Sequence, residues 1–124
     1  MLAADHRLRD STAFRRAITS GRRVGSPALV IHLAAASALD GPPPPARAGL
    51  VVNRTVGNAV TRNRVKRRLR HQLADLVGTL PPGTDLVVRA LPRAASMPSP
   101  ELRAELARCL ERALPNGDQV RAEA

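Results

Sequence analysis

Aromatic residues are almost absent from this chain of 124 residues. Phe14 is the only phenylalanine, and there is no tyrosine or tryptophan. Modules that stack RNA bases on the aromatic side chains of a sheet would therefore have almost nothing to stack with. Cysteine is equally scarce, because Cys109 stands alone and no internal disulfide can form. A chain without disulfides is typical of a reducing compartment, so we expect a cytoplasmic protein.

Long apolar segments are also lacking. The longest mostly apolar run, residues 27–39, is interrupted by His32 and falls short of the roughly 20 residues that cross a bilayer. The opening residues MLAADHRLRD contain no apolar core of a signal peptide. We therefore expect no membrane partner.

Clustered catalytic groups are missing as well. The ten acidic residues are scattered, unlike the carboxylates of a two-metal nuclease, and the three histidines share no metal-ligand spacing with each other or with Cys109. No glycine-rich phosphate loop is present. Cys109 falls on the apolar stripe of a predicted helix, which favours a core role over a nucleophile. We predict no catalytic residue and no metal site.

What the chain does contain is positive charge. Its formal net charge is +10 and its pI is about 11.8, which suggests a polyanionic partner. Nineteen of the twenty cations are arginine, whose planar fork suits phosphate, although a GC-rich coding sequence would give the same bias. With 44% hydrophobic residues, residues 1–124 are long enough for one domain with a single core.

Periodicity and capping signals predict the order helix, strand, strand, helix, strand, helix, and leave room for an additional strand. The predicted helices are residues 11–18 capped by Ser11, residues 59–77, and a last helix capped by Ser99 that extends to about residue 113. The predicted strands are residues 28–34, 49–54 and 85–91. Four prolines in residues 37–47 exclude a helix or strand interior and predict an exposed hairpin connection, while residues 115–124 form a frayed tail. The pattern indicates an α+β fold, a two-layer sandwich with a small mixed sheet.

The segment GNAVTRNRVKRRLRHQL, residues 57–73, places six cations between Arg62 and Arg70. It predicts a helix with Asn58 as N-cap and one apolar stripe, made of Val65, Leu69, Leu73 and Leu76. No acidic residue three or four positions away neutralises the cations, and cations oppose the dipole at a helix N-terminus. The side chains broadly opposite the stripe are Asn63, Arg64, Arg67, Arg70 and His71. We interpret the helix as a nucleic-acid-binding surface rather than an idle solvated face, because a bound polyanion would turn repulsion into attraction.

Beyond these patterns, GNAVTRNRVKRRLR resembles the R-N-R signature of the bacterial ribonuclease P protein family. RLRDSTAFRRAITSGRR resembles the first helix of that family, and AGLVVNRTVGNAVTRNR resembles its strand leading into the R-N-R helix. DLVVRALPRA followed by an amphipathic helix completes a likeness that covers about residues 7–114. The resemblance implies an α+β sandwich with a left-handed crossover between parallel strands around the basic helix, a connection that general rules disfavour.

The resemblance also implies a function. In this family the protein is a cofactor of a large catalytic RNA, which uses bound magnesium ions to cleave the 5′ leader from precursor tRNA. The expected partners are therefore ribonuclease P RNA, in a 1:1 complex, and precursor tRNA. The residues implied as RNA contacts are Arg62, Asn63 and Arg64, supported by Lys66, Arg67, Arg68, Arg70 and Arg54. The residues implied in the leader cleft are Phe14, Arg15, Ile18 and His32.

Three of these positions depart from the family pattern. Ile18 and His32 stand where aromatic residues are common, and Thr55 stands where a basic residue is frequent. From the strand pattern alone, His32 points to the sheet face opposite Ile31 and Leu33, where a plain sheet-surface histidine is the default interpretation.

Three rival functions remain open at this point. A structural RNA-binding protein of the ribosomal type would have a similar charge. A DNA-binding helix is disfavoured because a predicted strand, rather than a helix, precedes the basic segment. A self-sufficient nuclease is disfavoured by the scattered carboxylates.

Overall fold

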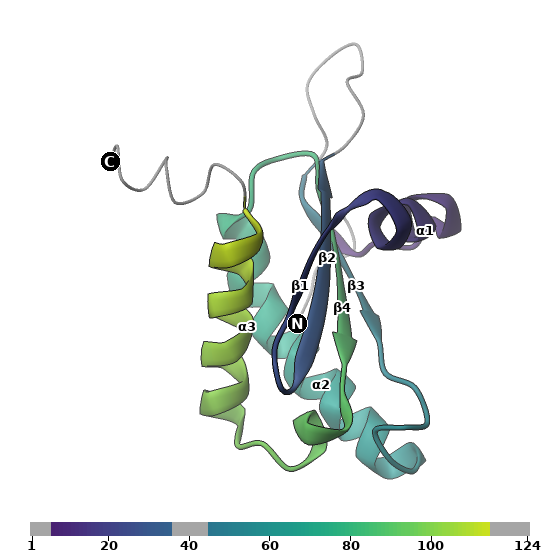
Figure 1. Ribbon diagram of the computed structural model, residues 1–124, viewed down its shortest axis with the longest axis vertical. Helices are drawn as coiled ribbons and strands as arrows, with labels where there is room; N and C mark the ends of the chain where they lie inside the picture. Colours follow the sequence, from purple (N-terminus) through teal and green to yellow (C-terminus); the bar gives the residue numbers. More distant parts are fainter. Residues whose placement is uncertain (1–5, 36–44, 115–124) are drawn as a thin grey trace.

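A computed structural model of the protein describes residues 6–35 and 45–114 (Figure 1). The elements are α1 (Ser11–Ser20), β1 (Arg22–Gly25), β2 (Leu29–Ala35), β3 (Arg47–Val51), α2 (Ala59–Leu76), the 3-10 turn η2 (Val77–Thr79), β4 (Thr84–Ala90), the 3-10 turn η3 (Pro92–Ala95) and α3 (Ser99–Ala113). The predicted α+β class is confirmed. The additional strand is β1, whose four residues are too few to show alternation.

The four strands form one mixed sheet in the order β1-β2-β4-β3. β2 is antiparallel to both β1 and β4, whereas β3 is parallel to β4, so α2 lies in the crossover between two parallel strands. The predicted hairpin connection between β2 and β3 is wrong, because β4 lies between these strands and they do not pair. Residues 36–44 of that connection and the predicted tail, residues 115–124, lie outside the described residues. The left-handed sense of the crossover stays a prediction.

Alternation along the strands gives the sheet two different faces. Leu29, Ile31 and Leu33 of β2 belong to the main core under α2 and α3. Ala34 belongs instead to a smaller cluster that includes Ala13 and other residues of α1. Figure 1 shows α1 on the opposite side of the sheet from α2 and α3. The helix α1 thus adds a short third layer to the predicted two, and among the described residues it is the helix on this second face.

The start of α2 is determined by two residues before it. Asn58 is the N-cap, as predicted, and its Oδ1 accepts a hydrogen bond from the Thr61 backbone N–H at 2.9 Å. Gly57 has a φ of +154°, a conformation that favours glycine, and a Cβ there would lie 2.9 Å from Thr61 Cγ2. The GNAVT segment therefore fixes where the basic helix begins.

The predicted caps of the other two helices are wrong by one residue. Asp10, not Ser11, caps α1, because its carboxylate accepts the Thr12 backbone N–H at 3.0 Å. At α3 the extended residue before the helix is Pro98, and Ser99 is already helical. None of the described helices is both long enough and apolar enough to cross a bilayer.

Candidate nucleic-acid interface

The polar face of α2 carries a dense group of exposed cations. Its buried stripe is Val65, Leu69 and Leu73, each with no exposed surface. The exposed residues on the other side are Asn63, Arg64, Arg67, Arg70 and His71. None of these three arginines forms an ion pair with a described residue. We call Asn63, Arg64, Arg67 and Arg70 the α2 face.

The cations beside the stripe have different surroundings. Arg62, Lys66 and Arg68 are half-buried. Arg68 Nη1 donates to the carbonyl of Met97 at 3.4 Å, which draws its guanidinium toward the segment before α3. Nε of Arg62 is buried and has no hydrogen-bond partner among the described residues. A buried N–H group without a partner can donate a hydrogen bond to a bound ligand.

A tight turn carries Arg54 at the N-terminal end of α2. Asn53 Oδ1 accepts hydrogen bonds from the backbone N–H of Thr55 at 3.2 Å and from its hydroxyl at 2.5 Å. The backbone N–H of Val56 donates to the Asn53 carbonyl at 3.1 Å, closing the turn. Arg54 is exposed there, before the N-cap of the basic helix.

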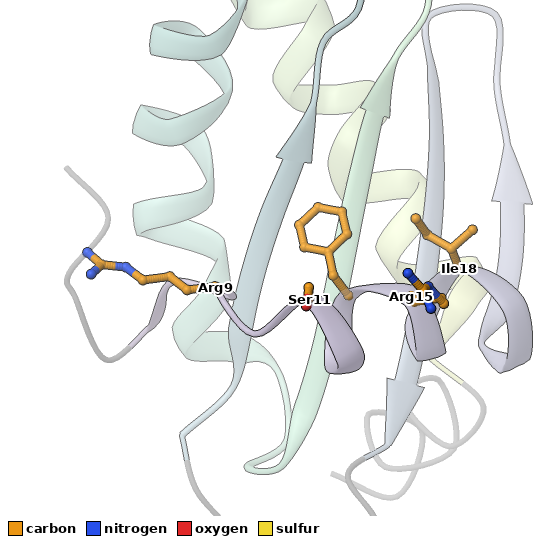
Figure 2. Close-up of a pocket in the computed structure, with 5 residues that line it drawn as sticks. Arg9, Ser11, Arg15 and Ile18 are labelled. Atoms are coloured by element: carbon orange, nitrogen blue, oxygen red, sulfur yellow. The ribbon is translucent and has the colours of Figure 1, made fainter.

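A shallow pocket of about 380 Å³ lies beside α1. Its lining residues are Arg9, Ser11, Phe14, Arg15 and Ile18, and Figure 2 shows Arg9 extending away from Arg15 and Ile18. The Phe14 ring rests on Gly49 of β3, where an added Cβ would come within 3.0 Å of the ring atom Cζ. The pocket thus combines an apolar floor with two guanidinium groups.

His32 lies on the same sheet face but does not line this pocket. It faces away from Ile31 and Leu33 as predicted, yet the default interpretation of a surface histidine is wrong, because only 6% of it is exposed. Burial is the main cause that lowers its pKa from 6.5, and the charges of Arg23 and Arg89 lower that pKa further. The structure thus brings together three of the four predicted cleft residues and places the fourth nearer the edge strand.

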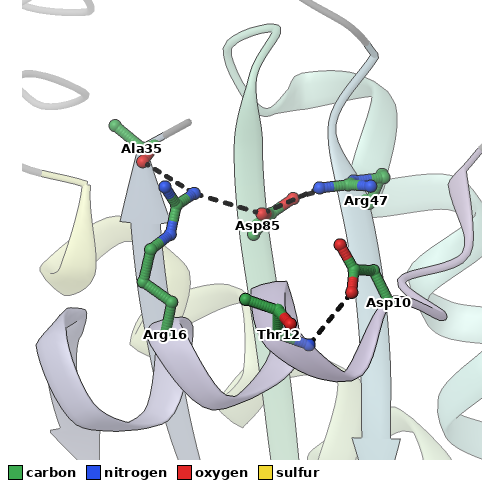
Figure 3. A network of polar contacts seen from close by, with 6 residues as sticks. All are labelled: Asp10, Thr12, Arg16, Ala35, Arg47 and Asp85. Atoms are coloured by element: carbon green, nitrogen blue, oxygen red, sulfur yellow. Dashed lines mark hydrogen bonds and ion pairs between the residues drawn. The ribbon is translucent and has the colours of Figure 1, made fainter. Parts of the chain in front are cut away.

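Sequence reasoning missed the buried Asp85. It is 1% exposed and accepts hydrogen bonds from Arg47 Nε at 2.9 Å and Arg47 Nη2 at 3.0 Å. Arg16 Nη2 lies 3.6 Å from Asp85 Oδ2 and donates to the Ala35 carbonyl at 3.4 Å (Figure 3). This cluster ties α1 to three strands and so fixes its position over the sheet. The only signal was an acidic residue at the start of an apolar strand.

The polar side chains of the described residues are better suited to binding phosphate than to coordinating a metal ion. No three His, Cys, Asp or Glu side chains of residues 6–35 and 45–114 are close enough to hold a metal. Guanidinium forks and an amide are instead suited to the oxygens of a nucleic-acid backbone. The structure thus defines a basic α+β protein with a mixed sheet and one helix, α2, whose exposed arginines form no ion pair with a described residue.

Comparisons with known proteins identify the family. The sequence profile of the Ribonuclease P family matches residues 2–114. The ribonuclease P protein component of Nocardioides sp. is 55% identical over 115 residues, covering 90% of this chain and 94% of the relative. The solved RNase P protein of Staphylococcus aureus has a TM-score of 0.74 at 25% identity, covering 88% of this chain and 95% of its own. That of Thermotoga maritima has a TM-score of 0.71 at 25% identity, covering 86% and 96%.

The chain therefore belongs to the ribonuclease P protein family, and the resemblance seen in its motifs is confirmed. A protein component of this kind is a subunit of an endoribonuclease that acts in tRNA processing.

Proposed function

We propose that the protein binds the catalytic RNA of ribonuclease P through the α2 face and holds the 5′ leader of precursor tRNA beside α1. It thereby promotes endonucleolytic removal of the leader and formation of the mature tRNA 5′ end. The observation that carries the proposal is the α2 face, whose arginines form no ion pair with a described residue, together with Arg62 beside it, a cation near the N-terminal end of the helix that the dipole disfavours. A charge distribution that disfavours the free helix is explained by an anionic ligand.

The catalytic RNA, with its magnesium ions, supplies the bond cleavage. The residues of this chain bind, orient and neutralise. Two RNAs that approach each other repel through their phosphates, and arginines placed between them lower that repulsion by neutralising phosphate charge, while the counterions they release favour binding. We therefore assign no catalytic residue and no protein metal ligand to this chain.

The pocket beside α1 supports the assignment of the leader cleft. Phe14 and Ile18 offer an apolar surface for a base, while Arg9 and Arg15 can contact the backbone on either side. Arg54, at the turn before α2, lies between the sheet and the RNA-binding helix in sequence and can contact phosphate near their junction. We further propose a 1:1 complex in the cytoplasm, with residues 1–124 as one RNA-binding domain.

The test is cleavage of a precursor tRNA by a bacterial ribonuclease P RNA at low magnesium concentration. We expect the protein to stimulate cleavage only when the RNA is present, and Arg62→Ala/Arg64→Ala to lose the stimulation. The matched control is Arg108→Ala/Arg112→Ala, which removes the same charge from exposed positions of α3. Cleavage by the protein alone, or equal stimulation by both double variants, would contradict the proposal.

A further inference from the structure

Three residues lie together on the α1-facing side of the sheet, near its β1 edge. Val24 and Val88 point into the main core, so their neighbours Arg23 of β1 and Arg89 of β4 point the other way, as His32 does. Arg23 pairs directly with His32 across β1 and β2, and Arg89 pairs with Val30, one diagonal step from His32. Long side chains reach each other over such diagonal separations.

No acidic group of the described strands neutralises this cluster. β1 and β2 contain no acidic residue, and the one on β4, Asp85, already binds Arg47 and Arg16. Neither Arg23 nor Arg89 forms an ion pair with a described residue. Both charges act on His32, whose pKa they lower together with burial. Two arginines around a buried histidine thus repel one another in the free protein.

The ring of His32 is incompletely satisfied. Its Nδ1 is buried and has no hydrogen-bond partner among the described residues. An unpartnered lone pair is tolerated more readily than an unpartnered N–H, so the ring proton belongs on Nε2. Because the charges of Arg23 and Arg89 both act on this ring, its Nε2–H is a third donor that can serve the same anion as their guanidinium groups.

We propose that Arg23, His32 and Arg89 form a binding site for a backbone phosphate of the precursor-tRNA leader. The site extends the leader path from Phe14 across the sheet to the edge strand β1. This inference rests on the proposed function, because it takes the leader to run beside α1. It differs from base stacking, since the three residues offer cationic forks and one N–H rather than an aromatic surface.

The first test compares precursor tRNAs with a long and with a one-nucleotide leader, using the reconstituted holoenzyme. Arg23→Gln/Arg89→Gln should raise KM for the long-leader substrate by roughly tenfold, flatten its salt dependence, and leave kcat and the short-leader substrate unchanged. The control Arg108→Gln/Arg112→Gln removes the same charge from α3. His32→Leu should raise KM, and His32→Gln, which keeps an N–H donor, should restore part of it.

A neutral methylphosphonate placed at successive leader linkages locates the contact. At one linkage, the methylphosphonate should raise KM with the unsubstituted protein. The same substitution should not raise KM further with Arg23→Gln/Arg89→Gln. NMR of the protein with inorganic phosphate supplies a readout independent of cleavage. Phosphate should shift the His32 ring signals and raise the pKa of His32, because the anion opposes the charges of Arg23 and Arg89.

The outcomes separate this inference from the function on which it rests. If the unsubstituted protein lowers KM for long leaders and Arg23→Gln/Arg89→Gln lowers it equally well, the phosphate site is wrong while the function stands. Reduced affinity for the catalytic RNA with unchanged leader dependence would also overturn the site, because the phosphate would then belong to that RNA. If neither the unsubstituted protein nor any variant changes cleavage by the RNA, for either substrate, the proposed function itself is contradicted.

Discussion

The helices α2 and α3 cover the same face of the sheet but carry their charges in opposite ways. α3 has an acidic residue, Glu101, in its first turn and a basic residue, Arg112, in its last. Both agree with the helix dipole. α2 has no acidic residue in its first turn and no basic residue in its last, and four of its six cations lie in its first half. The dipole therefore favours Glu101 and Arg112 of α3, whereas it gives the cations of α2 no such stabilisation.

Their buried polar residues differ as well. Glu105 of α3 accepts hydrogen bonds from Ser26 Oγ and, at 2.8 Å, from the Ala28 backbone N–H, so it holds the β1–β2 turn. Gln72 of α2 donates Nε2 to the Ser99 carbonyl at 3.1 Å, but its Oε1 has no partner among the described residues. The buried polar side chain of α3 is therefore more fully hydrogen-bonded than that of α2.

The largest expected effect tests whether the two helices nonetheless contribute equally to the core. Leu69 and Leu106 are both fully buried, one on each helix. Leu69→Ala and Leu106→Ala should each lower the free energy of unfolding by about 2–5 kcal/mol, through lost apolar burial and the cavity left behind. Urea unfolding measures both. A negligible loss for Leu69→Ala alone would show that α2 packs less tightly than its burial indicates.

A smaller effect should separate the buried polar residues. Glu105→Met leaves the Ala28 N–H without its acceptor and should lower stability by about 1–3 kcal/mol. Gln72→Met removes an unsatisfied oxygen together with one hydrogen bond, so its effect should stay within about 1 kcal/mol. The same urea experiment compares the two variants. An equal loss of stability in both would show that Glu105 and Gln72 contribute equally to the fold.

The same two helices show which features could be predicted from the sequence. The apolar stripe and Asn58 cap of α2 were predictable because local periodicity and capping chemistry determine them. Gln72 and Glu105 were not, because their partners are 27 and 77 residues away in sequence. Local patterns contain no information about such partners.

The candidate site shows the same limit. The exposure of Arg64 and Arg67 follows from the position of the stripe, and the R-N-R motif with its neighbouring segments pointed to the family. The burial of His32 and the ion pair between Asp85 and Arg47 depend on strand order. Local patterns did not predict that order, and the hairpin expected at the proline-rich segment was wrong, because β4 lies between β2 and β3.

The smallest expected effect concerns the helix dipoles in the free protein. Arg62→Gln should raise the free energy of unfolding and Glu101→Gln should lower it, each by about 0.3–1 kcal/mol. Thermal unfolding at low ionic strength measures these changes, and both should shrink in 1 M salt because exposed charges are then screened. A loss of stability in Arg62→Gln would mean that this cation contributes to the fold.

The most direct test of the account is the salt dependence of affinity for ribonuclease P RNA. Arg64→Ala/Arg67→Ala should weaken binding by about 1–3 kcal/mol per residue and reduce the salt slope by about two, as two phosphate contacts are lost. Arg108→Ala/Arg112→Ala on α3 should leave both quantities nearly unchanged. Equal losses from the two helices would show that only net charge matters, and would contradict the assignment of the α2 face as the RNA-binding surface.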